Sequence, residues 1–257
     1  MQRTVSSNSM EKTTKPSSSS ICCAQNSSDK DDKGVGLCLE DRIGGLPDVI
    51  LVSILSLLTM KEAARSSLIS KRWRYMWTYV TRMNFDASSI IDGILLGDKE
   101  VEAERPLYLS WVNQVLKSHN APTIDEFRVQ FDLDETCRFD IDNWINFAME
   151  KRVRSLKLDL KELTEYDREV GENYKFSHTN HLHSLSIGFT NCNSLTNLVL
   201  SHVDVSGRVL EYILTTCPSL EQLSVQESES LVNLKVPDLS LKLKHLEITY
   251  MLQCEKY

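Results

Sequence analysis

The spacing of apolar positions changes character along this chain of 257 residues. Residues 1–40 contain few aliphatic side chains, residues 41–86 carry them at helical intervals, and residues 87–257 mix strand-like alternation with further helical stretches. A segment with so few apolar residues cannot bury enough surface to offset the conformational entropy of the chain. We therefore expect a disordered Ser-rich tail (1–40), a small helical module (41–86) and an α/β region (87–257).

Two short helices are predicted at the start of the helical module. The stretch "LPDVILVSILSLL" has the i, i+3, i+4 spacing of a helix with a broad apolar face. The positions with this spacing are Pro47, Ile50, Leu51, Ile54, Leu55 and Leu58. Thr59 followed three residues later by Glu62 is the pattern of a capping box, which predicts a second helix. That helix would turn Ala63, Ala64 and Leu68 inward.

A third helix is predicted from about Ser70, and it separates aromatic from basic side chains. Its inward face would carry Trp73, Met76, Trp77 and Val80. On the same helix, Lys71, Arg72 and Arg74 fall on other sides. A groove that binds single-stranded nucleic acid needs stacking aromatic rings and cations on one face. The pattern therefore indicates packed tryptophans and solvated cations.

The α/β region alternates helices with strands. Helical spacing is found at 107–120 and at 140–150, the latter capped by Asp140 or Asp142, and strand-like alternation is found at 124–133. A frame L-x-x-L-x-L then recurs at 153–158, 182–187, 195–200, 220–225, 231–236 and 243–248.

The distance between these copies predicts what connects them. Between the copies at 195–200 and 220–225 there is room for a helix at 206–218, which would cover the sheet with Val209, Leu210, Ile213 and Leu214. The later copies are closer together and leave room only for a tight return. Because one copy cannot bury its apolar face alone, the copies must stack into a parallel sheet on the concave side of a curved solenoid.

Composition excludes several classes of function. The chain has 29 Lys and Arg against 36 Asp and Glu, a net charge of −7, which disfavours a dedicated binder of nucleic acid or anionic membranes. No apolar run approaches the roughly 20 residues that span a bilayer. The 7 scattered cysteines include no CxxC pair and indicate reduced thiols. The tail could also be an organelle transit peptide, although it has few basic residues and no amphipathic pattern.

The sequence contains little that could carry catalysis. His181 and His183 alternate around Leu182, so a strand would point both to the same face, as two zinc ligands can lie. No second ligand pair with zinc-site spacing accompanies them, so surface histidines are the favoured interpretation. Gly-rich phosphate loops and the G-x-S-x-G motif are absent from the sequence. We expect no metal, no cofactor and no active site.

The segment 41–86, "DRIGGLPDVILVSILSLLTMKEAARSSLISKRWRYMWTYVTRMNFD", resembles an F-box in the form found in plant F-box proteins with leucine-rich repeats. The "LPD" start, the "ILSLL" helix, the "KEA" turn, the "SKRWR" helix and the "NFD" exit carry the resemblance. Family members usually have Pro where this chain has Thr59, and a capping box takes its place. The phrases "CPSLEQLSV" and "SLKLKHLEI" resemble the repeats that follow the F-box. Many relatives continue into further repeats and an FBD-type domain, whereas this sequence ends at Tyr257, so we expect either an exposed final strand or a shortened family member.

The resemblance implies that the F-box docks onto the Skp-type adaptor of a cullin-RING (SCF-type) ubiquitin ligase. Carried over by position, the adaptor contacts would be Leu46, Pro47, Ile50, Ile54, Leu58, Leu68, Ser70 and Trp73. Lys and Arg outnumber Asp and Glu between Asp41 and Arg82, which suits the acidic adaptors of the family. The repeats would hold a target protein through variable concave positions such as Lys157, Ser186, Val199, Ser224, Lys235 and Glu247.

Three functions follow as hypotheses. The first is a non-catalytic substrate receptor in the nucleus or cytoplasm, which binds the adaptor and through it cullin, and brings an unknown target protein for ubiquitination. The second is a scaffold or decoy that engages the adaptor without recruiting a substrate. The third, of a different class, is a metal-dependent enzyme built around His181 and His183.

Overall fold

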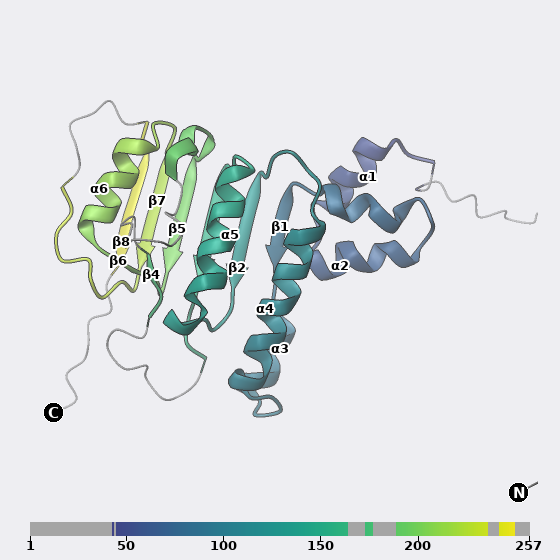
Figure 1. Ribbon diagram of the computed structural model, residues 1–257, viewed down its shortest axis with the longest axis horizontal. Helices are drawn as coiled ribbons and strands as arrows, with labels where there is room; N and C mark the ends of the chain where they lie inside the picture. The colour runs from purple at the N-terminus through teal and green to yellow at the C-terminus, as the bar shows by residue number, and fades with distance from the viewer. Residues whose placement is uncertain (1–42, 44, 164–172, 177–188, 236–241, 250–257) are drawn as a thin grey trace, which may run out of the picture. The chain divides into compact units, whose positions relative to one another are not determined.

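The computed structural model of this chain describes residues 43, 45–163, 173–176, 189–235 and 242–249 (Figure 1). The predicted tail at 1–40, the repeat copy at 182–187 and the pair His181 and His183 lie outside these residues. The chain divides into a unit of residues 1–40 and a unit of residues 41–257, and all described elements belong to the second. The predicted boundary between the helical module and the α/β region, at residue 86, stays a prediction.

The helical module consists of two α-helices followed by two 3-10 helices. These are α1 (Asp48–Leu55), α2 (Met60–Arg65), η1 (Ser66–Leu68) and η2 (Trp73–Tyr79). The predicted capping box is present, because Thr59 Oγ1 accepts the Glu62 N–H at 3.3 Å and Glu62 Oε2 accepts the Thr59 N–H at 2.9 Å. The third helix begins at Trp73, later than predicted, and it is a 3-10 helix. Its run of aromatic side chains has only modest α-helical propensity.

One apolar core joins the module to the α/β region. Leu51 and Leu55 of α1 and Trp73 of η2 belong to one buried cluster. The same cluster contains Phe85 of β1 (Arg82–Phe85) and Val112 of α4 (Val101–Ser118). A module of about forty residues is marginal by itself, because it buries too small a fraction of its surface. Packing against the α/β region therefore supplies apolar contacts that the four short helices of the module lack.

Six parallel strands form the main sheet, in the order β1-β2-β3-β5-β7-β8. They are β1 (Arg82–Phe85), β2 (Glu126–Gln130), β3 (Ser155–Asp159), β5 (Asn197–Ser201), β7 (Gln222–Gln226) and β8 (His245–Thr249). Phe127, Leu156, Leu198 and Leu223 stand side by side in register and are fully buried. The copies predicted at 153–158, 195–200, 220–225 and 243–248 are confirmed as parallel strands. Strands β4 (Lys175–Phe176) and β6 (Asp204–Val205) pair in a second, smaller sheet.

Three helices cover one face of the main sheet (Figure 1). They are α4 (Val101–Ser118), α5 (Arg138–Glu150) and α6 (Gly207–Thr216). As predicted, α6 turns four buried aliphatic side chains toward the core, namely Val209, Leu210, Ile213 and Leu214. The shorter elements are α3 (Ser88–Leu95), η3 (Glu135–Cys137) and η4 (Phe189–Ser194). The opposite face of the sheet carries the polar alternate positions of each strand.

The repeat copy predicted at 231–236 is wrong as a strand. Residues 231–235 adopt no strand, and β7 pairs directly with β8 in register, Leu223 opposite Leu246. The short spacing of these copies leaves no room for an extra strand between the two. Lys235 is exposed on this connecting segment and is therefore not a position of the sheet.

The ends of two helices also differ from the prediction. Helix α4 begins at Val101 and α3 precedes it, in a segment whose acidic residues hide the helical pattern. Helix α5 begins at Arg138 after Cys137, so neither Asp140 nor Asp142 caps it. The side chain of Asp134 instead caps η3 by accepting the Thr136 N–H, and the chain is already helical when it reaches Asp140.

Candidate interaction surfaces

The outside of the helical module carries apolar side chains that its core leaves uncovered. Helix α1 buries Leu51 and Leu55, whereas Ile50 is 46% exposed and Ile54 is 38% exposed. Residues one position apart on a helix point about 100° apart, so the two pairs define an inner and an outer face. The broad apolar face predicted from the sequence is therefore divided into two faces. The inner face packs in the core, and the outer face stays partly exposed.

The structure places all eight predicted adaptor contacts on this module, with different exposures. Five of them are exposed, namely Pro47, Ile50, Ile54, Leu68 and Ser70. Two are half-buried, namely Leu46 and Leu58, and Trp73 is buried. The prediction that Leu68 turns inward is wrong, since α2 ends at Arg65 and Leu68 is 86% exposed on η1. Trp73 is 6% exposed, as expected for a packed aromatic residue.

Sequence reasoning missed four further aliphatic side chains that the module exposes. Val49 and Leu57 flank the outer face of α1, and Ile43 and Ile69 lie before it and beyond η1, all more than half exposed. The signal was present in the sequence, because residues 43–69 contain more large aliphatic residues than one helical face can bury. Clustered exposed apolar residues of this kind mark a surface for a partner.

Arg72 fixes the start of the module to its third helix. Its Nε lies 3.1 Å from Asp48 Oδ1, and its guanidinium also donates to the backbone carbonyl oxygen of Leu46. This links the segment before η2 to the first residue of α1. The cation that the sequence indicated as solvated is thus exposed but paired, while Lys71 and Arg74 are simply exposed.

The second candidate surface is the polar face of the main sheet. Four of the predicted target-binding positions form one row across neighbouring strands, in the order Lys157, Val199, Ser224 and Glu247. Ser186 lies outside the described residues. The row exists because the pleat sends alternate side chains of a strand to opposite faces. The residues just before and after each row position point to the other face, where the helices bury them.

Polar side chains line a shallow hollow of about 530 Å³ on this face, over β3, β5, β7 and β8. Ser224 donates to Glu247 Oε2 at 3.0 Å, and Gln226 Nε2 donates to Ser224 Oγ at 3.3 Å. Asn197 and His245 belong to the same lining. An array of amide, hydroxyl and carboxylate groups can hydrogen-bond to a polypeptide.

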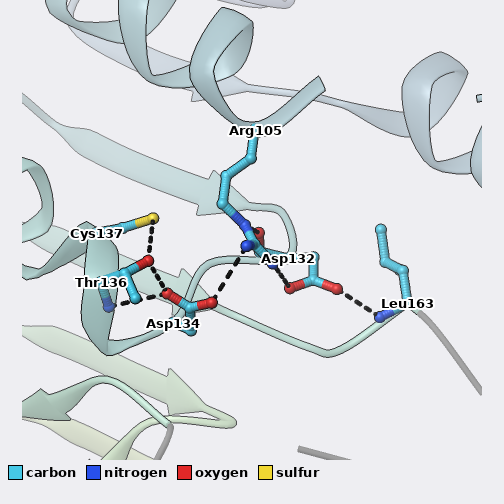
Figure 2. Close-up of polar contacts among 6 residues, drawn as sticks. All are labelled: Arg105, Asp132, Asp134, Thr136, Cys137 and Leu163. Atoms are coloured by element: carbon cyan, nitrogen blue, oxygen red, sulfur yellow. Dashed lines mark hydrogen bonds and ion pairs between the residues drawn. The ribbon is translucent and has the colours of Figure 1, made fainter. Parts of the chain in front are cut away.

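An ion pair on α4 holds the strand ends in place (Figure 2). Arg105 Nη2 lies 2.9 Å from Asp132 Oδ1, and Arg105 Nη1 lies 3.2 Å from Asp134 Oδ2. Asp132 is buried, and its other oxygen accepts the backbone N–H of Leu163 at 2.9 Å. Burial alone would lower the pKa of Arg105, but Asp134 and Asp132 outweigh burial and raise it. The cluster is structural, because it joins α4 to the segments after β2 and β3.

The described residues offer no support for the metal hypothesis and do not test it fully. Within the described ranges, no three His, Cys, Asp or Glu side chains lie together in a way that could hold a metal ion. His181 and His183 lie outside these ranges. The three cysteines within these ranges, Cys137, Cys192 and Cys217, are free and buried. Within the same ranges, no helix has both the length and the apolar character to cross a membrane.

Comparison with known proteins identifies both regions of the chain. The family model described as "At1g61320/AtMIF1, LRR domain" matches residues 115–256, and that of the F-box domain matches residues 43–84. The F-box/LRR-repeat protein At3g03360 of Arabidopsis thaliana is 31% identical over 94% of this chain and 50% of its own length. The F-box/FBD/LRR-repeat protein At4g00160 of the same plant is 30% identical over 76% of this chain and 38% of its own length.

The chain thus spans about half the length, or less, of these two relatives. No solved structure matches it.

Proposed function

We propose that this chain, which belongs to the family of F-box proteins with leucine-rich repeats, is a substrate receptor of an SCF-type ubiquitin ligase. Its F-box would bind a Skp-type adaptor and through it cullin, and its repeat sheet would bind a target protein. The resemblance to the family is confirmed by both matches, whereas the adaptor, the target and the site residues are proposals.

The observation that carries the adaptor half is the uncovered outer face of α1. Ile50 and Ile54 stay exposed although the same helix fills a core, and Leu57 and Leu68 are exposed close by in the sequence. Each such side chain contributes roughly 1.5–3 kcal/mol when a partner covers it completely. A few central residues of this kind are enough to dominate the affinity of an interface.

The polar sheet face supports the target half of the proposal. It presents side chains from six neighbouring strands on one surface, while α4, α5 and α6 lie on the other face (Figure 1). Stacked repeats characteristically use such an extended surface for binding. The row from Lys157 to Glu247 would supply part of its specificity.

The proposed mechanism is proximity, and this chain performs no chemical step in it. Holding a target and the ligase together raises the effective concentration of the target lysine near the activated ubiquitin. We place this activity in the nucleus or the cytoplasm, where the ligase would meet its targets. A scaffold or decoy would share the adaptor surface and lack the last step.

The experiment compares adaptor binding by wild-type protein and by the double variant Leu46→Ala with Pro47→Ala. Pro47 precedes the first residue of α1 and is exposed, so the variant removes apolar contact and a preset helix start while the sheet remains folded. We expect adaptor co-purification to fall by at least about tenfold. Leu107→Ala, which changes an exposed leucine on α4, is the control and should bind normally.

Two results would change this conclusion. Unchanged adaptor recovery by the double variant contradicts the F-box assignment of the surface. Normal adaptor binding, combined with a bound target whose ubiquitination does not depend on Pro47, favours the scaffold over the receptor.

A further inference from the structure

A hollow of mixed character lies at the carboxyl ends of β2 and β3, beside α3. It has a volume of about 340 Å³, and apolar side chains of α3 and of the segments after the two strands form one side of it. The apolar residues are Ile91, Leu95, Phe131 and Leu163. Leu95 is 66% exposed although its helix packs on the molecule. The polar side is formed by Gln130, Asp159, Lys161 and Glu162, and it continues into the polar face of the sheet.

The adjoining part of the sheet face is basic, on an acidic protein. Arg128 of β2 stands directly opposite Lys157 of β3, and like charges in this position repel each other. Lys157 is compensated, since its Nζ lies 2.7 Å from Glu126 Oε1. Arg128 donates only to the neutral Gln130 Oε1, at 2.9 Å, and makes no ion pair within the part of the chain that the structure describes.

A second exposed arginine lies diagonally beside the first. Arg82 of β1 pairs in register with Glu126, two residues before Arg128, so both arginines project from the same face. Among the described residues, Arg82 too has no ion pair. Two guanidinium groups at diagonal positions of one sheet face, neither in an ion pair within the described ranges, are suited to bind a carboxylate, because each can offer paired N–H donors.

The basic patch, formed by Arg82 and Arg128, lies two residues along the strand from the hollow. Arg128 and Gln130 are alternate residues of β2 on the same face, about 7 Å from each other along the strand. An extended peptide has the same distance between its own alternate side chains. A peptide that places an acidic side chain on Arg128 can therefore place the side chain two positions away at Leu95.

We propose that this surface binds an extended acidic segment of the target protein. A Glu or Asp side chain pairs with Arg128 and Arg82, and a large apolar side chain two positions away enters the hollow beside Ile91 and Leu95. The charge of the two arginines and the uncovered side chain of Leu95 favour such a segment as the occupant. This site deepens the proposed function, because it names the chemistry of the target, and it does not depend on adaptor binding.

The test selects peptides from a random displayed library on the immobilised full chain, without an adaptor. We expect enriched peptides to share an acidic and a large apolar residue two positions apart. Their affinity, measured by fluorescence polarisation on synthetic copies, should fall at least about tenfold with Arg128→Glu and with Leu95→Asp. Arg128→Glu should not unfold the protein, because it replaces a like-charge neighbour of Lys157 by an opposite charge.

Two control variants make the same changes elsewhere. Arg208→Glu alters an exposed arginine on α6, and Leu107→Asp alters an exposed leucine on α4; both should bind the peptides as the wild type does.

Several outcomes overturn the inference. These are a selection that returns no peptides, peptides without the acidic residue, and binding that survives both test variants. Binding of nucleic acid by Arg82 and Arg128 regardless of sequence, with a steep salt dependence, would replace the peptide by a polyanion. If the selected peptides bind as expected but a protein carrying one is not ubiquitinated by the adaptor complex, the proposed function fails and the peptide site remains.

Discussion

The guanidinium of Arg105 on α4 lies 2.9 Å from a carboxylate oxygen of Asp132, whose side chain is 2% exposed. Replacing Arg105 by Met would remove the guanidinium that offsets this buried negative charge. Removing one member of a buried ion pair lowers the free energy of unfolding by on the order of 3–5 kcal/mol. Replacing both members by apolar residues of similar size costs less. We expect that loss in the free energy of unfolding, measured by urea denaturation followed by tryptophan fluorescence.

The second substitution Asp132→Asn is the control for this result. It removes the buried negative charge, and the amide oxygen can still accept the Leu163 N–H, so the double variant should regain part of the lost stability. A single Arg105→Met variant within about 1 kcal/mol of wild type would contradict the structural role of the pair.

A glycine at the start of α6 allows a later segment to pass. A Cβ added to Gly207 would stand 1.7 Å from the backbone carbonyl oxygen of Asn233. Gly207→Ala should therefore displace the connection between β7 and β8 and make it sensitive to proteases, with a loss of stability. Limited proteolysis, with mass spectrometry of the fragments, locates the first cut.

Gly93 of α3 supplies the matched control. An added Cβ there would meet only the side chain of Lys99, which can move away, and alanine has the higher helix propensity by about 1 kcal/mol. Gly93→Ala should leave the protease pattern unchanged. Equal protease sensitivity of both variants would show that Gly207 has no special packing role.

The sequence predicted what depends on regular spacing. The capping box of Thr59 and Glu62 and the inward side chains of α6 were visible because each follows from local periodicity. The inner and outer faces of α1 could not be predicted. Leu51 and Ile50 are equally apolar, and only packing shows which of them lies in the core. The patch around Arg128 could not be found either, because it depends on the register with Lys157, and register is set by strands that are far apart in the sequence.

Burial makes the stability of the fold depend on the protonation of His119. This side chain is 7% exposed and its Nε2 lies 2.9 Å from the Val80 carbonyl oxygen. Burial lowers its pKa from the ordinary 6.5, although the contact with Val80 opposes the shift. The unfolded chain therefore takes up a proton first as the pH falls. The stability due to neutral His119 is fully present above about pH 6.5 and is lost as the pH falls toward the lowered pKa.

The variant His119→Gln tests this dependence, because glutamine can still donate to Val80 and does not titrate. The free energy of unfolding should be compared for both proteins between about pH 7.5 and 5. The difference between the two curves should have a slope of at most about 1.4 kcal/mol per pH unit, with the wild type losing more stability on acidification. Parallel curves would rule out His119 as the titrating group.

The stretch from Leu68 to Trp77 contains both packed rings and exposed cations, and the two kinds of residue should differ in their effect on adaptor binding. Trp73 is 6% exposed within the module, so Trp73→Ala should cost on the order of 3–5 kcal/mol, loosen the F-box and abolish binding. Trp73→Phe keeps most of the packing and removes an indole N–H that has no hydrogen-bond partner among the described residues, so it should retain binding.

The cations of this stretch should act on the rate of association. Lys71→Ala with Arg74→Ala leaves the core intact, and exposed charges at the edge of an interface steer the encounter more than they hold the complex. We expect slower association with the adaptor at low salt, a difference that shrinks as salt is added, and an unchanged rate of dissociation. Surface plasmon resonance at several salt concentrations separates the two rates. If this double variant abolishes adaptor binding while Trp73→Ala stays folded and binds, the aromatic face does not point inward and the stretch binds polyanions instead.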